Sequence, residues 1–160
     1  MTTYLKEDFL YDADLVLEDS LDTNGDVAAI DGAASYAGSI LAVETVIDLG
    51  DGLVEGYMIV DIDDIEPHGN DELYIIKLQG NNDGDFADAT AYDLAQISIG
   101  AGEVLANGTD GTDVGAAGDR FVVPFRNEQN GTVYRYVRCI QVLTGASAAI
   151  TDTIWLSIKR

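Results

Sequence analysis

The stretch that decides the fold is RFVVPFRNEQNGTVYRYVRCIQVLTGASAAITDTIWLSIKR, residues 120–160. Residues 133–143 are one strand candidate in it, and apolar and polar residues alternate along two further segments, 120–126 and 148–159. Such alternation is typical of a strand with one buried face. Asn130-Gly131 is a hairpin-turn pair between the first two segments, and Thr144-Gly145 begins the connection to the third. The sequence therefore predicts successive strands joined by short turns.

The three segments differ in how they are expected to be buried. Pro124 cannot donate to a strand ladder, so 120–126 is predicted to be an edge strand. Even spacing in 148–159 predicts a half-buried strand, with Ile150, Ile154, Leu156 and Ile158 on one face. Apolar residues stand on both faces of 133–143. That segment is expected to be covered on both sides, on one side by the core and on the other by a partner.

Short strands continue toward the N-terminal side, separated by many of the 17 glycines in the chain. In 54–62 we expect Met58, Val60 and Ile62 on one face, and in 73–79 we expect Tyr74, Ile76 and Leu78 inward. The other predicted strands are 41–49, 94–99 and 103–106. About eight strands with regular turns predict an all-β sandwich or barrel.

Residues 1–40 fit this pattern less well. Leu15, Val16 and Leu17 are a strand candidate, but DTNGDVAAIDGAASYAGS is small and irregular. We predict an N-terminal arm over 1–40 and a single β-sandwich domain over 41–160, which is long enough to bury its own core.

The charge is divided unevenly along the chain. Residues 1–119 carry 27 of the 29 acidic side chains against two lysines, a net charge of −25. Residues 120–160 carry six basic side chains against Glu128 and Asp152, a net charge of +4, and the whole chain carries −21. Nucleic acid and anionic membranes are therefore not expected as partners. No signal peptide or spanning segment is evident, so we expect a soluble protein made in a cytoplasm.

Catalytic chemistry has few candidate residues. His68 lies in a turn by composition, and Cys139 lies within a strand with no second histidine to activate it. Asp61, Asp63 and Asp64 could form a glycosidase-like carboxylate pair, but a solvated acidic face is the alternative that burial statistics favour. We therefore expect no enzymatic activity, no catalytic residue and no cofactor.

Calcium is the one metal that the sequence raises. Asp22, Asn24 and Asp26 match the first ligands of an EF-hand loop, but Val27 and Ala33 stand where glycine and glutamate belong. A second run, Asn81, Asp83 and Asp85, fails likewise. Ordinary Asx turns are the alternative, and no metal ligand is assigned.

The ordered segments resemble the capsid cement (decoration) proteins of short-tailed bacteriophages, a jelly-roll family on the outside of the shell. The matching pieces span 41–160 and are VIDLG at 46–50, YMIVDI at 57–62, LYIIKLQGNNDGDFAD at 73–88, RFVVPF at 121–126, RYVRCIQVLTG at 135–145 and AAITDTIWLSIK at 148–159.

The resemblance implies a non-enzymatic jelly-roll virion protein that is made in the host cytoplasm and binds the major capsid protein. It also implies a homo-oligomer, a dimer or alternatively a trimer. From the charge division we take as candidate interface residues Arg120, Arg126, Arg135, Arg138, Tyr134 and Tyr136. Internal pairing of these arginines with Asp and Glu is the competing interpretation.

A carbohydrate- or calcium-binding β-sandwich on a viral or secreted surface is the second functional hypothesis. Sugar binding needs coplanar exposed rings, which Tyr134, Tyr136 and Trp155 provide only if they point outward.

Overall fold

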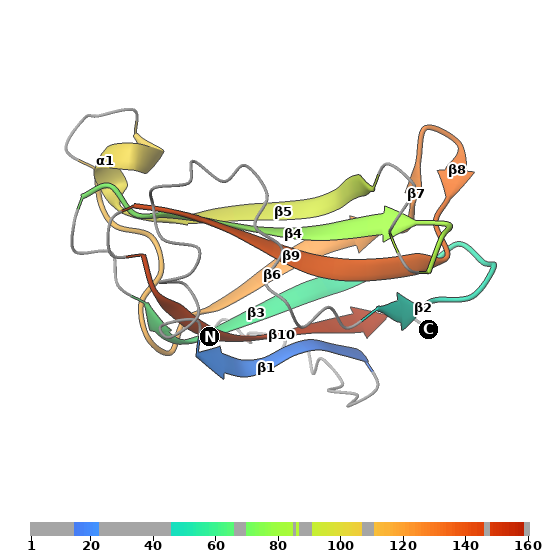
Figure 1. Ribbon diagram of the computed structural model, residues 1–160, viewed down its shortest axis with the longest axis horizontal. Coiled ribbons are helices and arrows are strands. Elements are labelled where there is room, and N and C mark those ends of the chain that lie inside the picture. The colour runs from blue at the N-terminus through green and yellow to red at the C-terminus, as the bar shows by residue number, and fades with distance from the viewer. Residues whose placement is uncertain are drawn as a thin grey trace, which may run out of the picture.

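The computed structural model describes residues 15–22, 46–65, 70–84, 86, 91–106, 111–145 and 148–158. Two four-stranded antiparallel sheets face each other across a common core (Figure 1). One sheet has the order β1 (Val16–Asp22), β10 (Ile150–Ile158), β3 (Glu55–Ile65), β6 (Arg120–Arg126). The other has the order β2 (Ile47–Asp48), β9 (Tyr136–Thr144), β4 (Leu73–Asn81), β5 (Tyr92–Gly100). The predicted all-β sandwich is confirmed.

Strand pairing follows a nested order along the chain. β1 pairs with β10, β2 with β9, β3 with β6 and β4 with β5. A short hairpin, β7 (Glu128–Gln129) and β8 (Thr132–Val133), lies between β6 and β9. Apart from this hairpin, the described strands form one long antiparallel ribbon whose successive strand pairs fall alternately in the two sheets, β1–β10 and β3–β6 in one and β2–β9 and β4–β5 in the other.

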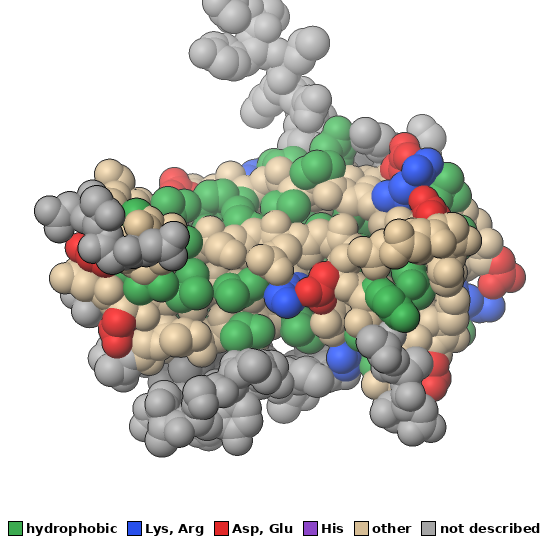
Figure 2. All heavy atoms as spheres, turned by 90° about the horizontal axis from the view of Figure 1, so that it is seen from above, with side chains coloured by type: hydrophobic (Ala, Val, Ile, Leu, Met, Phe, Trp, Pro, Cys, Tyr) green, Lys and Arg blue, Asp and Glu red, His purple; other side chains and the backbone are tan. Residues whose placement is uncertain are grey.

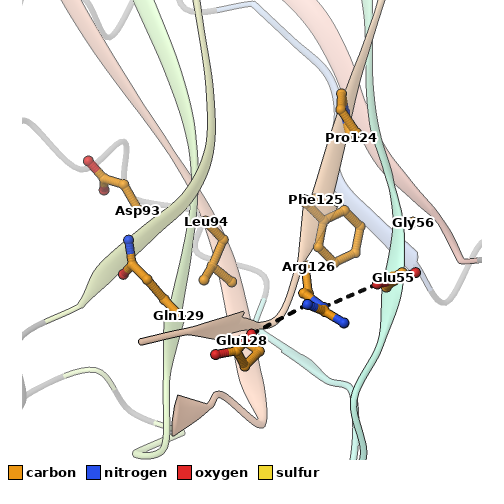
Figure 3. Close-up of a pocket in the computed structure, with 9 residues that line it drawn as sticks. All are labelled: Glu55, Gly56, Asp93, Leu94, Pro124, Phe125, Arg126, Glu128 and Gln129. Atoms are coloured by element: carbon orange, nitrogen blue, oxygen red, sulfur yellow. Dashed lines mark ion pairs between the residues drawn. The ribbon is translucent and has the colours of Figure 1, made fainter. Parts of the chain in front are cut away.

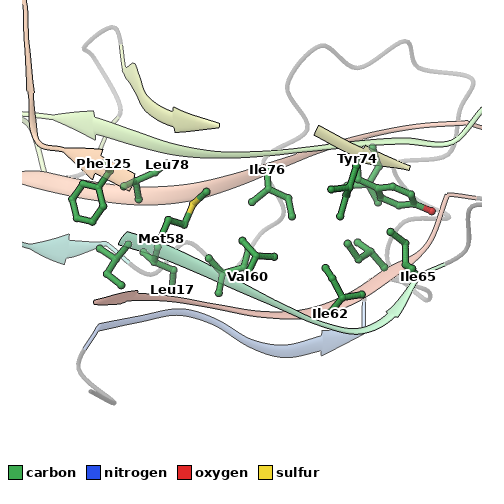
Figure 4. Packing of buried hydrophobic residues seen from close by; sticks show 14 of the residues in the cluster. Leu17, Met58, Val60, Ile62, Ile65, Tyr74, Ile76, Leu78 and Phe125 are labelled. Atoms are coloured by element: carbon green, nitrogen blue, oxygen red, sulfur yellow. The ribbon is translucent and has the colours of Figure 1, made fainter. Parts of the chain in front are cut away.

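The core lies between the inner faces of the sheets (Figure 4). Met58, Val60 and Ile62 of β3 point toward the other layer, as predicted, and each is at most 2% exposed. Three inward side chains of β4 meet them: Tyr74, Ile76 and Leu78. Burying one such aliphatic side chain stabilises the fold by roughly 1.5–3 kcal/mol, so the six side chains together contribute strongly to the stability of the sandwich.

Several predicted boundaries change. Residues 103–106 are not a strand: α1 (Gly102–Leu105) is a single helical turn, and Asp113 accepts a hydrogen bond from the Gly102 amide at 2.9 Å. The strand in 41–49 is reduced to Ile47–Asp48 among the residues described. Segment 133–143 is split, because the Asn130-Gly131 turn closes the short β7–β8 hairpin before β9 begins.

The N-terminal arm is corrected in part. Val16–Asp22 forms β1, pairs with β10 and places Leu17 in the core at 3% exposure. Residues 16–22 therefore belong to the sandwich, and the boundary at residue 40 does not separate a domain from an arm there. Residues 1–14 and 23–45 lie outside the described part of the chain.

Pro124 is where the sequence predicts it. β6 is the edge strand of its sheet, and Pro124 is paired in register with Tyr57 of β3. The missing amide hydrogen costs least at an edge, where one side of the strand has no neighbouring ladder.

We expect Gly56→Ala in β3 to destabilise the fold. An added Cβ would collide with the backbone carbonyl oxygen of Ser157 in β10, and backbone cannot move aside as a flexible side chain can. The free energy of unfolding should fall by about 1–3 kcal/mol in chemical denaturation. Gly52→Ala is the matched control, since no atom lies within 4 Å of the position that its new Cβ would occupy. Equal stability of the two variants would contradict the close β3–β10 packing.

Candidate functional site

The predicted interface residues fall into two structural groups. Arg120, Arg126 and Arg135 have side chains 54%, 50% and 41% exposed. Arg138 and Tyr134 are only 7% and 6% exposed in the single chain. Arg138 and Tyr134 therefore do not contribute to an exposed surface, which corrects that part of the prediction.

Arg135 joins the loop before β9 to the β2 turn. Its Nε and Nη2 donate to the two carboxylate oxygens of Asp48 at 2.8 and 2.7 Å, and its Nη1 donates to Asp51 at 3.1 Å. The hydrogen bonds from Arg135, and next the Gly50 amide, lower the pKa of Asp48, and the same pairing raises the pKa of Arg135. The guanidinium also lies 5.2 Å from the ring centre of Tyr136. Arg135 and Tyr136 thus act as partners within the chain.

Arg120 and Asp61 face each other across the β3–β6 pair. Arg120 binds both carboxylate oxygens, and Trp155 Nε1 donates to Asp61 Oδ2 at 3.2 Å. Burial alone would raise the pKa of Asp61, but the hydrogen bonds from Arg120 and Trp155 outweigh it and the pKa is lowered. Asp61 is thus held ionised at neutral pH, which makes it unsuited to act as a general acid.

Arg126 and Arg138 are also engaged. Arg126 pairs with Glu55 at 3.1 Å and with Glu128 at 3.6 Å. Arg138 donates to Gln79 Oε1 and lies over the Phe86 ring at 4.3 Å. Arg120, Arg126 and Arg135 are therefore paired with carboxylates of the same chain, which is the competing interpretation. Arg138 is buried and packs against Phe86.

One exposed strip nevertheless remains on the outer face of β6. Its alternate residues Arg120, Val122, Pro124 and Arg126 are all exposed, with Val122 at 39%. We call these four residues the β6 strip. Arginine beside exposed apolar side chains is a composition that protein interfaces favour, whereas sheets facing water usually carry polar residues there.

A groove of about 440 Å³ opens beside this strip, between β3 and β6 of one layer and β5 of the other (Figure 3). Leu94 and Phe125 form its apolar wall, and the Arg126 ion pairs with Glu55 and Glu128 cross its mouth. Its lining residues hold no nucleophile next to a base. The groove therefore offers shape and charge.

Metal and sugar sites find little support in the described residues. No group of three or more His, Cys, Asp or Glu side chains there is arranged to hold a metal ion. Asn81 Oδ1 accepts hydrogen bonds from the Asn82 and Asp83 amides at 2.7 and 3.1 Å. These bonds form an Asx turn, which was the alternative to a calcium site at these residues. Asp85, His68 and residues 24–26 lie outside the described part.

The rings considered for sugar binding are mostly covered. Trp155 is 2% exposed, and Tyr134 is buried against Tyr92 with the ring centres 5.2 Å apart. Cys139 is half-buried and packs against the core. No helix of the described residues is long and apolar enough to cross a membrane.

Asn127 and Asp152 are two of the buried polar groups that the sequence reasoning missed. Asn127 is 0% exposed, and its side chain accepts from the Val54 amide and donates to the carbonyls of Gly52 and Tyr134 at 2.7–3.0 Å. It fastens the chain before β3 to the β7–β8 hairpin. The only sequence feature that pointed to Asn127 was its position directly after Arg126, where β6 ends. Many turns have an asparagine at such a position, so this feature does not predict burial.

Asp152 is the second, at 0% exposure inside the sandwich. Gln141 Nε2 donates to both of its carboxylate oxygens, at 2.9 and 3.1 Å, and so links β9 to β10 across the two layers. Burial raises the pKa of Asp152 to about 7, the Gln141 hydrogen bond opposes this, and the charge of Asp63 adds to it. Burial of Asp152 could have been predicted from the even spacing of Ile150, Ile154 and Leu156, because residue 152 falls on the same inward face.

The comparisons with known proteins give no relative. No family model, no curated protein and no solved structure matches this chain. The function must therefore be argued from the residues and the fold.

We expect Asp152→Asn to stabilise the protein at neutral and alkaline pH. The folded-state pKa of about 7 lies above the ordinary 3.8, so the wild-type protein loses stability as the pH rises from about 4 to 7. Asparagine keeps a hydrogen bond with Gln141 but carries no charge to bury. The melting temperature at pH 8 should rise by several degrees, since about 1 kcal/mol is worth roughly 2–4 °C in a domain of this size.

The difference between Asp152→Asn and the wild type should shrink toward pH 4. Asp63→Asn, which removes a neighbouring exposed charge, should give a smaller gain at pH 8. A melting-temperature difference that does not depend on pH would show that Asp152 is not protonated in the folded state.

Proposed function

We propose that this chain is a structural virion protein, a cement or decoration protein that binds the outside of a tailed-phage capsid. The observation that carries the proposal is the nested strand order, with β1-β10-β3-β6 in one sheet and β2-β9-β4-β5 in the other. We infer a jelly roll from this order, since eight strands in two interlocked Greek keys give that pairing. The jelly roll is the fold that the sequence resemblance implies.

The distribution of chemistry supports a binding role over catalysis. The side chains that could have been catalytic or metal-binding within the described residues serve structural hydrogen bonds and ion pairs, as Asp61 and Asn81 do. Fold alone does not establish function, so this argument rests on the site as well as the topology.

The β6 strip is the surface that we propose to meet the major capsid protein. Arg120 and Arg126 are already neutralised by Asp61 and Glu55, so the strip approaches a shell without a net charge to desolvate. Val122 and Pro124 between them supply exposed apolar area. Planar arginines beside apolar side chains are favoured at such contacts.

Homo-oligomer formation is part of the proposal. The sequence argument for it was that a partner would cover one of the two apolar faces of residues 133–143. The outward residues Arg138 and Ile140 of β9 are buried within the single chain, at 7% each. Two-sided burial of β9 therefore needs no second subunit, and a different surface must be sought for self-association.

The sugar-binding alternative is less well supported, because Tyr134 and Trp155 are buried rather than displayed. A glycan array and calcium titration of the purified chain would test it directly. Binding there, without binding to shells, would favour the alternative over the proposed function.

Co-sedimentation with empty phage shells tests the proposal. The shells should be built from the major capsid protein of the tailed phage whose genome encodes this chain. Saturable binding is expected to the outer surface of the shells. Absence of saturable binding at low salt would refute the proposal.

Val122→Glu should reduce shell binding at least about tenfold, because it places an unpaired carboxylate in the middle of the β6 strip. Leu53→Glu is the control: it adds the same charge at another exposed apolar residue, 52% exposed, in the turn before β3. Circular dichroism should show both variants folded. Equal binding by the two variants would move the contact away from β6.

A further inference from the structure

Among the described residues the two sheets have four outer strands, three of which are shaped against pairing with another strand. β2 has only two residues, β6 carries Pro124, and β1 shifts register twice along β10. Short length, proline and irregular register are the features by which natural sheets protect their edges. The fourth outer strand, β5, is different.

β5 is long and largely uncharged. It has nine residues, Tyr92–Gly100, without proline, and its one charged residue is Asp93 near the start. Its pairing with β4 shifts register once, between Leu78 and Gln79, and is regular from Ala95 onward. A bridge from Gly100 to Val114 closes only the far end of the strand. Figure 1 shows β5 at the outer border of its sheet.

The core behind β5 is left partly open. Ala95 and Ile97 pair with Leu78 and Ile76 of β4 and share their inward face. Leu78 and Ile76 are 0% exposed, whereas Ala95 and Ile97 are only half-buried although they pack against the same core. An additional strand beside β5 would cover this apolar edge, which water now reaches.

Charge restricts what that strand can be. With a net charge of −21, two copies of the chain repel one another over most approaches. Around β5 the outward residues Gln96 and Ser98 are neutral, and Lys77 pairs with Asp93 at 2.8 Å. Figure 2 views the molecule from the side of this sheet and shows apolar and neutral atoms over most of its middle, with charged side chains of both signs scattered among them. A second copy can approach here at small electrostatic cost.

We propose that β5 of one copy pairs antiparallel with β5 of a second copy about a two-fold axis at Ile97. Two four-stranded sheets would then join into one continuous sheet, and each β5 would complete its backbone hydrogen bonds. In this register Gln96 stands opposite Ser98 of the second copy, and the two Asp93 carboxylates lie apart, beyond the paired region. The inference shares with the proposed function only the expectation that copies associate, and it does not involve the β6 strip.

Light scattering and hydrogen exchange of the purified chain test the proposal. The mass should approach twice 17.1 kDa as concentration rises. Amides of residues 92–99 should become more protected over the same range, while those of β6 should not change. A single species of 17.1 kDa at every concentration would overturn the proposal, as would a dimer with no added protection in β5.

A charge exchange gives the sharper test. Gln96→Glu places two carboxylates near the two-fold axis, and Ser98→Lys places two ammonium groups there, so each variant alone should dissociate at least about tenfold more readily. Gln96 faces Lys77 within its own sheet, so a glutamate there keeps a favourable neighbour and the variant should fold. Mixed together, the two variants should form a heterodimer, because the new carboxylate and ammonium groups then stand opposite each other.

The β5 pairing and shell binding can be tested separately, because different results would refute each of them. Leu53→Glu should leave the dimer intact while adding the same charge as Gln96→Glu. Failure of the mixed variants to associate, with both folded, would refute pairing at Ile97. A monomer that still coats shells would refute the β5 pairing and leave the proposed function standing. A β5 dimer that does not bind shells would support the β5 pairing and refute the proposed function.

Discussion

The packing of β3 against β4 is the interaction on which the rest of this structure depends. These two strands belong to different sheets, yet their inward side chains are at most 2% exposed and fill the space between the layers. Every other strand of the sandwich is attached to one of them directly or through β9 or β10. The edges, the groove and the outer surfaces are therefore placed by the way in which this central contact orients the two sheets.

Electrostatics is arranged locally around that core. The excess of acid in the first three quarters of the chain would repel any compact state, but the exposed arginines each meet an acid from a distant segment, as Arg135 meets Asp48. Exposed pairs contribute little energy individually. Their effect is local, because each pair sets one guanidinium against the carboxylates beside it and leaves the net charge of the chain at −21.

Much of the fold could be predicted from the sequence, because a period of two in apolar residues reports directly which face of a strand is buried. The inward faces of residues 54–62 and 73–79, the edge position of Pro124 and the Asn130-Gly131 turn all follow from local rules. The short helix at 102–105 did not, because four residues carry too little periodicity to distinguish a helical turn from a strand. The exposure of the candidate interface residues was harder to predict from the sequence. Arg138, for example, is covered by Phe86, which lies far from it in sequence.

The pairing of β1 with β10 also sets the order in which the sandwich can form. β10 lies between β1 and β3, so the sheet that contains them has a gap until residues 150–158 are available. During synthesis β1 must wait, without its neighbour, while more than a hundred residues are added. Contacts so distant in sequence slow folding, and strands that wait unpaired are prone to join other chains. High negative charge along the early part of the chain would keep neighbouring nascent chains apart during that interval.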